Sequence, residues 1–133
     1  MSKGMVFGVF DRLHEGHRNF LTQAAALCGE LIVVLAPSET VQILKKRSPH
    51  YSYEKRRSDI VEMSPNLTIV PGDTALGEWH VLEDHQPDII LLGYDQQGIA
   101  RELEKFNIPF QFLEPYYPER YKSSLLNGLE NKI

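Results

Sequence analysis

The stretch Met5-Val-Phe-Gly-Val-Phe-Asp-Arg-Leu-His-Glu-Gly-His17 decides the fold of this 133-residue chain. Its first six residues form an apolar run, and apolar residues after His17 recur at helical spacing as far as Cys28. The pattern predicts a strand, a tight turn and a helix that opens near two histidines. Free N–H groups at a helix start attract phosphate, and Gly8 and Gly16 allow a ligand to approach the backbone closely.

Three interpretations of His14 and His17 are open from spacing alone. The pair supplies half of a metal ligand set, but no cysteine pair or carboxylate triad lies nearby in the sequence. The two imidazoles could also simply cap or pack the helix. We favour a phosphate site, because strand, turn, glycine, histidine and helix follow one another in the order that such a site requires.

Apolar runs alternate with segments of helical pattern along the whole chain. We expect strands at 5–10, 31–36, 67–70, 88–92 and 110–113, helices at 17–28, 52–63, 78–85, 98–106 and 123–129, and a long loop at 37–51. Continuously apolar strands separated by helices predict an α/β fold. The expected architecture is a single doubly wound, Rossmann-like domain over residues 1–133, with a five-stranded parallel sheet flanked by helices. Ligands bind such sheets beyond the carboxyl ends of the strands.

Composition limits the class of protein. The chain is 42% hydrophobic and 24% charged, as in an ordinary soluble domain, and no apolar run approaches the roughly 18 residues that cross a bilayer. Cys28 is the sole cysteine, so we expect a cytoplasmic protein without an internal disulfide. The net charge of −4 argues against a nucleic-acid partner. Six of the 14 basic residues nevertheless fall between Lys45 and Arg57. A small phosphorylated ligand is the simplest partner for this stretch, whereas charge alone favours a solvated loop and helix face.

The segment from Gly8 to His17 resembles the G-x-F-D-x-x-H-x-G-H signature of the cytidylyltransferase-like nucleotidyltransferases. That family joins a nucleotide to a phosphate monoester and releases pyrophosphate. The resemblance implies that the signature, with Val9 where many members have threonine, contacts the nucleotide. The implied contacts are Gly8, Val9, Phe10, Asp11, His14 and His17.

Other segments extend the resemblance along the chain. Gly93-Tyr-Asp95-Gln96 is similar to a segment of archaeal-type FAD synthases, which implies that Gly93 and Asp95 bind the nucleotide. Residues 51–56 resemble an element of glycerol-phosphate cytidylyltransferases, in which Ser52 caps a helix and Arg56 holds the acceptor phosphate. Near the C-terminus, the resemblance assigns Ser123 and Ser124 to the nucleotide phosphates and leaves the role of Arg120 doubtful, since Pro118 occupies the family's usual arginine position.

Nucleotidyl transfer needs fixed cationic or hydrogen-bonding groups more than a strong base, because the attacking phosphate is already ionised. We expect His14, His17 and Lys45 to be catalytic, and Asp11, Lys45, Arg47 and Arg56 to hold the acceptor phosphate. Mg²⁺ is expected to arrive on the triphosphate, with no side-chain ligands. The leading function is an FMN adenylyltransferase using ATP. The alternatives are a glycerol-3-phosphate cytidylyltransferase using CTP and a binding module without turnover. The family resemblance makes a homodimer plausible, and no membrane partner is expected.

Overall fold

The structure is a computed structural model that describes residues 2–73 and 79–114, apart from the side chain of Leu44. The expected helix at 123–129 lies outside these residues. The described strands are Lys3–Gly8 (β1), Glu30–Leu35 (β2), Thr68–Pro71 (β3), Ile89–Leu92 (β4) and Phe110–Phe112 (β5). The described helices are Glu15–Ala26 (α1), Ser38–Lys45 (α2), Tyr53–Met63 (α3), His80–His85 (α4) and Gln97–Leu103 (α5), the last followed by a 3₁₀ turn at Glu104–Phe106.

The five strands form one parallel sheet in the order β3-β2-β1-β4-β5. The chain adds strands outward from β1 to one edge and then returns to the other side of β1. The switch in strand order therefore falls between β1 and β4, where a doubly wound sheet offers a ligand crevice. This confirms the predicted Rossmann-like α/β fold.

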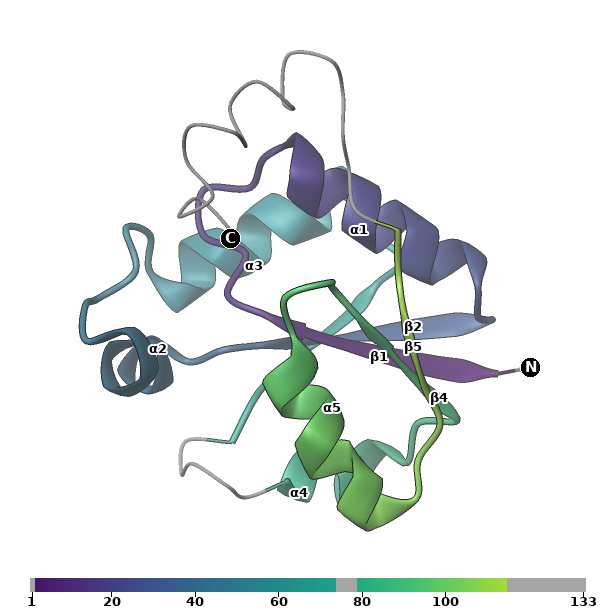
Figure 1. Cartoon of the computed structure of the whole chain (residues 1–133). Coiled ribbons are helices and arrows are strands. Elements are labelled where there is room, and N and C mark those ends of the chain that lie inside the picture. The colour runs from purple at the N-terminus through teal and green to yellow at the C-terminus, as the bar shows by residue number, and fades with distance from the viewer. Residues whose placement is uncertain (1, 74–78, 115–133) are drawn as a thin grey trace.

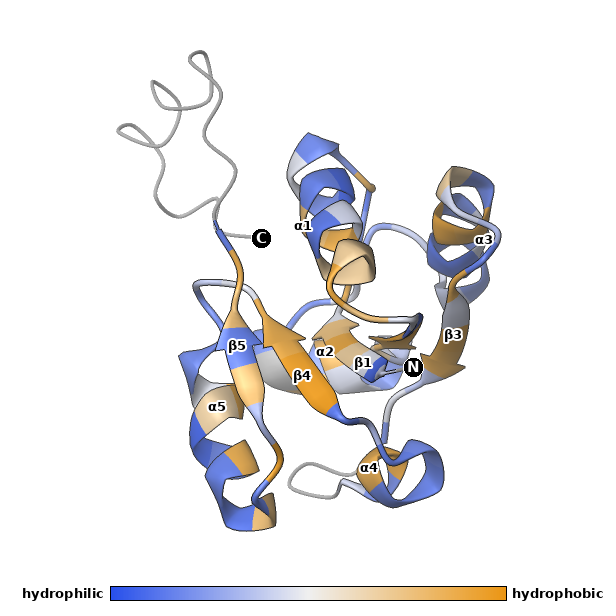
Figure 2. Ribbon diagram, turned by 90° about the vertical axis from the view of Figure 1, so that its right-hand side faces the viewer, coloured by the Kyte–Doolittle hydropathy of each residue, from blue (hydrophilic) through white to orange (hydrophobic). Residues whose placement is uncertain are grey.

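Alternating residues of the strands place one apolar cluster on each face of the sheet. On β2, Leu31, Val33 and Leu35 belong to the first cluster, while Ile32 and Val34 belong to the second. Helices α1 and α3 lie over the first face and α4 and α5 over the second (Figure 1). The apolar strands stand out between these helices in Figure 2. None of the described helices has the length and hydropathy needed to cross a membrane.

The structure corrects two local predictions. The expected loop at 37–51 contains α2, which has no side-chain cap at its N-terminus because Pro37 precedes it. The first helix begins at Glu15 rather than residue 17, with His14 as its N-cap. Histidine is not among the usual N-cap residues, so the sequence pattern gave no start signal there.

Candidate functional site

The two histidines close the N-terminus of α1 by capping it reciprocally. The backbone N–H of Gly16 donates to Nδ1 of His14 at 3.1 Å, and the backbone N–H of His14 donates to Nδ1 of His17 at 3.3 Å. The rings stack with their centroids 3.7 Å apart. These two capping hydrogen bonds thus start the helix and fix the orientation of both imidazoles.

This arrangement determines where each ring carries its hydrogen. An Nδ1 atom that accepts from a backbone N–H is unprotonated, so the neutral ring carries its hydrogen on Nε2. His14 and His17 therefore each present an Nε2–H donor. Nε2 of His17 is buried and has no hydrogen-bond partner among the described residues. A buried donor left unpaired is costly, and an anionic oxygen would satisfy it.

Both histidines are held neutral near pH 7. Desolvation lowers the pKa of His17 to about 3, with a further lowering from neighbouring His14. Desolvation, followed by the charges of Arg18 and Arg12, also lowers the pKa of His14. Each neutral ring donates one hydrogen bond through Nε2, while its Nδ1 is already engaged by a backbone N–H and its pKa is lowered, which suits the pair to bind and orient phosphate rather than to act as general bases.

The turn between β1 and α1 is tightly packed. Phe10 has a left-handed backbone, with φ of 51°, and its ring is almost fully buried against the His17 ring at a centroid distance of 5.4 Å. A Cβ on Gly8 would lie 2.5 Å from this ring, so only glycine fits without displacing Phe10. Gly8 is therefore needed for the packing of the turn as well as for the approach of a ligand to the backbone.

Asp11 fastens this turn to the loop before α3. Its carboxylate accepts hydrogen bonds from the backbone N–H groups of His50 at 2.7 Å and Tyr51 at 3.0 Å. Burial alone would raise the pKa of Asp11, but these hydrogen bonds outweigh it and bring the pKa below its ordinary value. This link cannot be predicted from the sequence, because nothing in the spacing joins residues 11 and 50.

The guanidinium of Arg56, which the resemblance assigns to the acceptor phosphate, has its hydrogen-bond partners within the protein. The Arg56 side chain is completely buried. The guanidinium donates to the carbonyl groups of Val9, Ala36 and Tyr51 and to Oγ of Ser38, at 2.8–3.1 Å. It thereby joins the segments that follow β1 and β2 to the starts of α2 and α3, and its role is structural support of the site.

The basic residues between positions 45 and 57 lie in different environments. Lys45 ends α2 and Arg47 lies just beyond it, both with exposed side chains near the carboxyl edge of the sheet. Lys55 pairs with Asp59 at 2.8 Å, and Arg56 is buried. Ser52 caps α3 through a hydrogen bond from the N–H of Lys55, as predicted.

The end of β4 meets the end of β1 through a side chain. Gly93 follows β4, and Asp95 is exposed in the turn before α5. Gln96 accepts from the N–H of Gly93 and donates to the carbonyl of Phe7, both at 2.9 Å. The segments expected to bind nucleotide are thus adjacent, whereas Arg120, Ser123 and Ser124 lie outside the described residues.

A flat ligand would need aromatic surface on which to stack. Trp79 packs edge-on against Phe7 at 5.5 Å and lies 6.5 Å from Phe106, so its ring belongs to the second apolar cluster. Tyr116, Tyr117 and Tyr121 lie outside the described residues.

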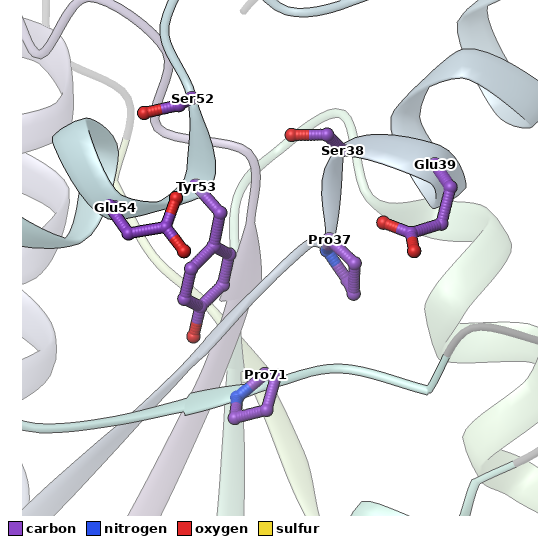
Figure 3. A pocket seen from close by; sticks show the side chains of 7 residues that line it. All are labelled: Pro37, Ser38, Glu39, Ser52, Tyr53, Glu54 and Pro71. Atoms are coloured by element: carbon purple, nitrogen blue, oxygen red, sulfur yellow. The ribbon is translucent and has the colours of Figure 1, made fainter.

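A pocket of about 370 Å³ opens between the starts of α2 and α3 (Figure 3). Its lining consists of Pro37, Ser38, Glu39, Ser52, Tyr53, Glu54 and Pro71. The two carboxylates disfavour a phosphate there. The described residues contain no group of three or more His, Cys, Asp or Glu side chains suited to hold a metal ion.

Comparison with known proteins agrees with this geometry. The model of the cytidylyltransferase-like family matches residues 5–124. The FAD synthase of Methanosarcina barkeri is 42% identical over 110 residues, covering 79% of this chain and 73% of the relative. The FAD synthase of Thermococcus sibiricus is 35% identical over 122 residues, covering 89% of this chain and 81% of the relative.

Solved structures share the fold. The lipopolysaccharide core biosynthesis protein of Thermoplasma volcanium superposes with a TM-score of 0.75 at 28% identity, covering 87% of this chain and 98% of that one. A bifunctional NMN adenylyltransferase/ADP ribose pyrophosphatase from Francisella tularensis gives a TM-score of 0.62 at 15% identity, covering 96% of this chain and 42% of that one. The second likeness concerns the fold alone.

Proposed function

Because the chain belongs to the cytidylyltransferase-like family and is a nucleotidyltransferase, we propose that it is an FMN adenylyltransferase. In this reaction, a phosphate oxygen of FMN attacks the α-phosphorus of ATP. A new P–O–P bond forms, the bond to the β-phosphate oxygen breaks, and pyrophosphate departs with the displaced electron pair. The product is FAD. The relatives named FAD synthase support this choice of substrates.

The reciprocal histidine cap is the observation that carries the proposal. It leaves two Nε2–H donors on adjacent stacked rings, one of them buried and without a partner among residues 2–73 and 79–114. Donors fixed before the reaction stabilise charge on a transferring phosphoryl group without reorganising. In the proposal, His14 and His17 donate to the α-phosphate, and the start of α1 adds the favourable end of its dipole.

The remaining site residues bind and orient the substrates. Lys45 and Arg47 attract the phosphates of ATP and FMN, and Gly93 and Asp95 adjoin the adenosine. The roles of Ser123 and Ser124 in binding the β- and γ-phosphates rest on the family resemblance. Mg²⁺ would be held by the triphosphate oxygens and would neutralise part of their charge. A homodimer in the cytoplasm is the assembly and location that we infer.

A product screen tests the choice of substrates. Purified protein with Mg²⁺ is incubated with every combination of ATP or CTP with FMN or glycerol-3-phosphate, and products and pyrophosphate are measured by chromatography. FAD should form from ATP and FMN. If CTP and glycerol-3-phosphate alone react, the chain is the cytidylyltransferase that residues 51–56 suggest. Absence of pyrophosphate in every mixture would favour a binding module.

Histidine variants test the mechanism. His14→Ala and His17→Ala should each lower kcat about 10²–10³-fold, the usual cost of losing one preorganised donor. ATP affinity, measured by isothermal titration calorimetry, should change much less because the donors act most strongly in the transition state. Circular dichroism checks that the variants remain folded. Unchanged kcat in either folded variant would remove that histidine from the catalytic assignment.

A further inference from the structure

The seam between β1 and β4, meaning the edge along which these two strands pair, ends before either strand does. Their register covers two pairs, Gly4↔Ile89 and Met5↔Ile90, although β1 continues to Gly8 and β4 to Leu92. On its other edge, β1 pairs with β2 over its full length. The opening beyond the last pair lies at the switch in strand order, beside the turn that carries the two histidines.

Backbone directions identify which groups face the opening. Ile90 N–H and Leu92 C=O bond on the β5 side, so the N–H of Gly93 points toward β1. Gly8 C=O accepts from Ala36 on the β2 side, so the carbonyl of Phe7 points toward β4. Continuing the register beyond its last pair would bring the N–H of Gly93 and the carbonyl of Phe7 together as a ladder hydrogen bond.

The carboxamide of Gln96 occupies that place. Its Oε1 accepts from the N–H of Gly93 and its Nε2 donates to the carbonyl of Phe7, each at 2.9 Å. These partners fix the orientation of the amide, because a carbonyl cannot donate and an N–H cannot accept. Both strand ends keep a hydrogen bond while remaining separated by the width of one amide group.

Gln96 is itself held firmly in place. Its backbone N–H donates to the carbonyl of Gly93 at 3.0 Å, closing the turn that contains Asp95. Its backbone carbonyl accepts from Ala100 in α5 at 3.3 Å. Through this one residue, the turn after β4, the start of α5 and the end of β1 form a connected unit.

We propose that Gln96 is a positioning residue, whose carboxamide sets the spacing between the two halves of the nucleotide site across the β1–β4 seam. One half is the turn from Gly8 to His17, and the other is the turn from Gly93 to Gln96. The inference rests on the proposed nucleotidyl transfer, because it concerns how ATP is aligned with the histidines. A misplacement of about 1 Å between such halves is enough to impair binding and reaction strongly.

Substitution of the carboxamide tests the proposal. Gln96→Glu keeps an acceptor for Gly93 but removes the donor to Phe7 and places a charge against a carbonyl oxygen. KM for ATP should rise at least about tenfold, with a smaller fall in kcat. Gln96→Met, which keeps the length and removes both hydrogen bonds, should shift KM in the same direction. Gln97→Glu is the matched control, since it makes the same charge change at the exposed neighbouring residue and should leave KM unchanged.

Calorimetric titration of ATP separates this inference from the proposed function. If the wild type makes no FAD, the adenylyltransferase proposal fails, but weaker ATP binding by Gln96→Glu than by Gln97→Glu still supports the positioning role. Lower melting temperatures with unchanged KM and ATP affinity in the folded Gln96 variants would overturn it, leaving a structural role only.

Hydrogen exchange of the wild-type protein gives a second test, which does not depend on whether a variant folds. The amide of Gly93 should exchange at least about tenfold more slowly than that of Gly98, an exposed glycine in the first turn of α5. Equal exchange at the two glycines would show that the Gln96 hydrogen bond does not persist, and the proposal would fail.

Discussion

Arg56 is the largest completely buried side chain of the described residues, and it is charged. Its four described hydrogen bonds go to uncharged oxygen atoms, three of them backbone carbonyls at the ends of different segments. Arginine suits such a place because its planar group presents several donors in fixed directions. The cost of burying the charge is offset by these hydrogen bonds and by attraction to the nearby carboxylate of Asp11.

Replacing Arg56 should therefore destabilise the protein more than replacing its neighbour. Arg56→Met leaves three buried carbonyl groups without their donor, and we expect a loss of about 3 kcal/mol in the free energy of unfolding. Arg57→Met, at an exposed position, is the matched control and should change stability by less than about 0.5 kcal/mol. Urea denaturation measures both. Equal stability of the two variants would contradict the structural role of Arg56.

His17 should make the folded protein sensitive to acid. Its pKa falls from the ordinary value of 6.5 to about 3 on folding. Between these values the unfolded chain binds the extra proton, so the contribution of His17 to stability is complete above pH 6.5 and is lost as the pH falls toward 3. The stability difference between wild type and His17→Asn, followed by urea denaturation, should shrink from pH 7 to pH 4. A constant difference would mean that His17 titrates normally in the folded state.

The residue pair Gly4 and Cys28 brings the turn after α1 close to β1. A Cβ on Gly4 would lie 2.7 Å from Sγ of Cys28 and 3.1 Å from its Cβ, so the missing side chain lets this turn approach the strand. Burial raises the pKa of the Cys28 thiol, which keeps it protonated as a packing residue.

A double-mutant cycle measures this contact. Gly4→Ala should lower the free energy of unfolding by about 1–3 kcal/mol through overpacking. In a Cys28→Ala background, which removes the sulfur, the same substitution should cost much less. The cycle is measured by thermal or urea unfolding. Additive effects of the two substitutions would show that the side chains at positions 4 and 28 do not contact each other.

The alternation of apolar runs was sufficient to predict all five strands and their parallel arrangement, because the three central strands β1, β2 and β4 carry continuous runs of buried apolar residues. Helix α2 was not predicted because its N-cap position is occupied by Pro37, which has no side chain that can cap, so the sequence shows no start signal there. The signature predicted that the two histidines lie at a helix start. The burial of Arg56 and the bridging by Gln96 depend on contacts between distant segments, which spacing along the chain does not reveal.

Charge over the whole molecule is negative, yet Lys45 and Arg47 remain exposed at the edge where the strands end. An anionic substrate approaching this edge meets a local positive field within an otherwise acidic protein. Arg56, in the same basic stretch, is buried and contributes less to the field at the surface.

Removal of either charge should weaken binding of phosphorylated ligands. Lys45→Ala and Arg47→Ala should reduce the affinity for ATP or FMN several-fold, and the difference from wild type should decrease with rising salt as the charges are screened. Calorimetric titration at two ionic strengths measures it. Lys105→Ala, which removes a charge from the 3₁₀ turn after α5, is the control. Equal affinities in the wild type and the three variants would show that Lys45 and Arg47 do not bind phosphate and only form part of the solvated surface.

The central position of β1 also has a consequence for synthesis of the chain. Its β2-facing edge is completed by residue 35, and β3 extends that half of the sheet by residue 71. Its other edge has no partner until Ile89 and Ile90 leave the ribosome, several seconds later at about 5–20 residues per second. During that interval, the nascent protein exposes an unpaired apolar strand edge, the feature by which chains aggregate or are bound by chaperones. The crevice proposed to receive nucleotide thus closes only after both seams on the other side of β1 have formed.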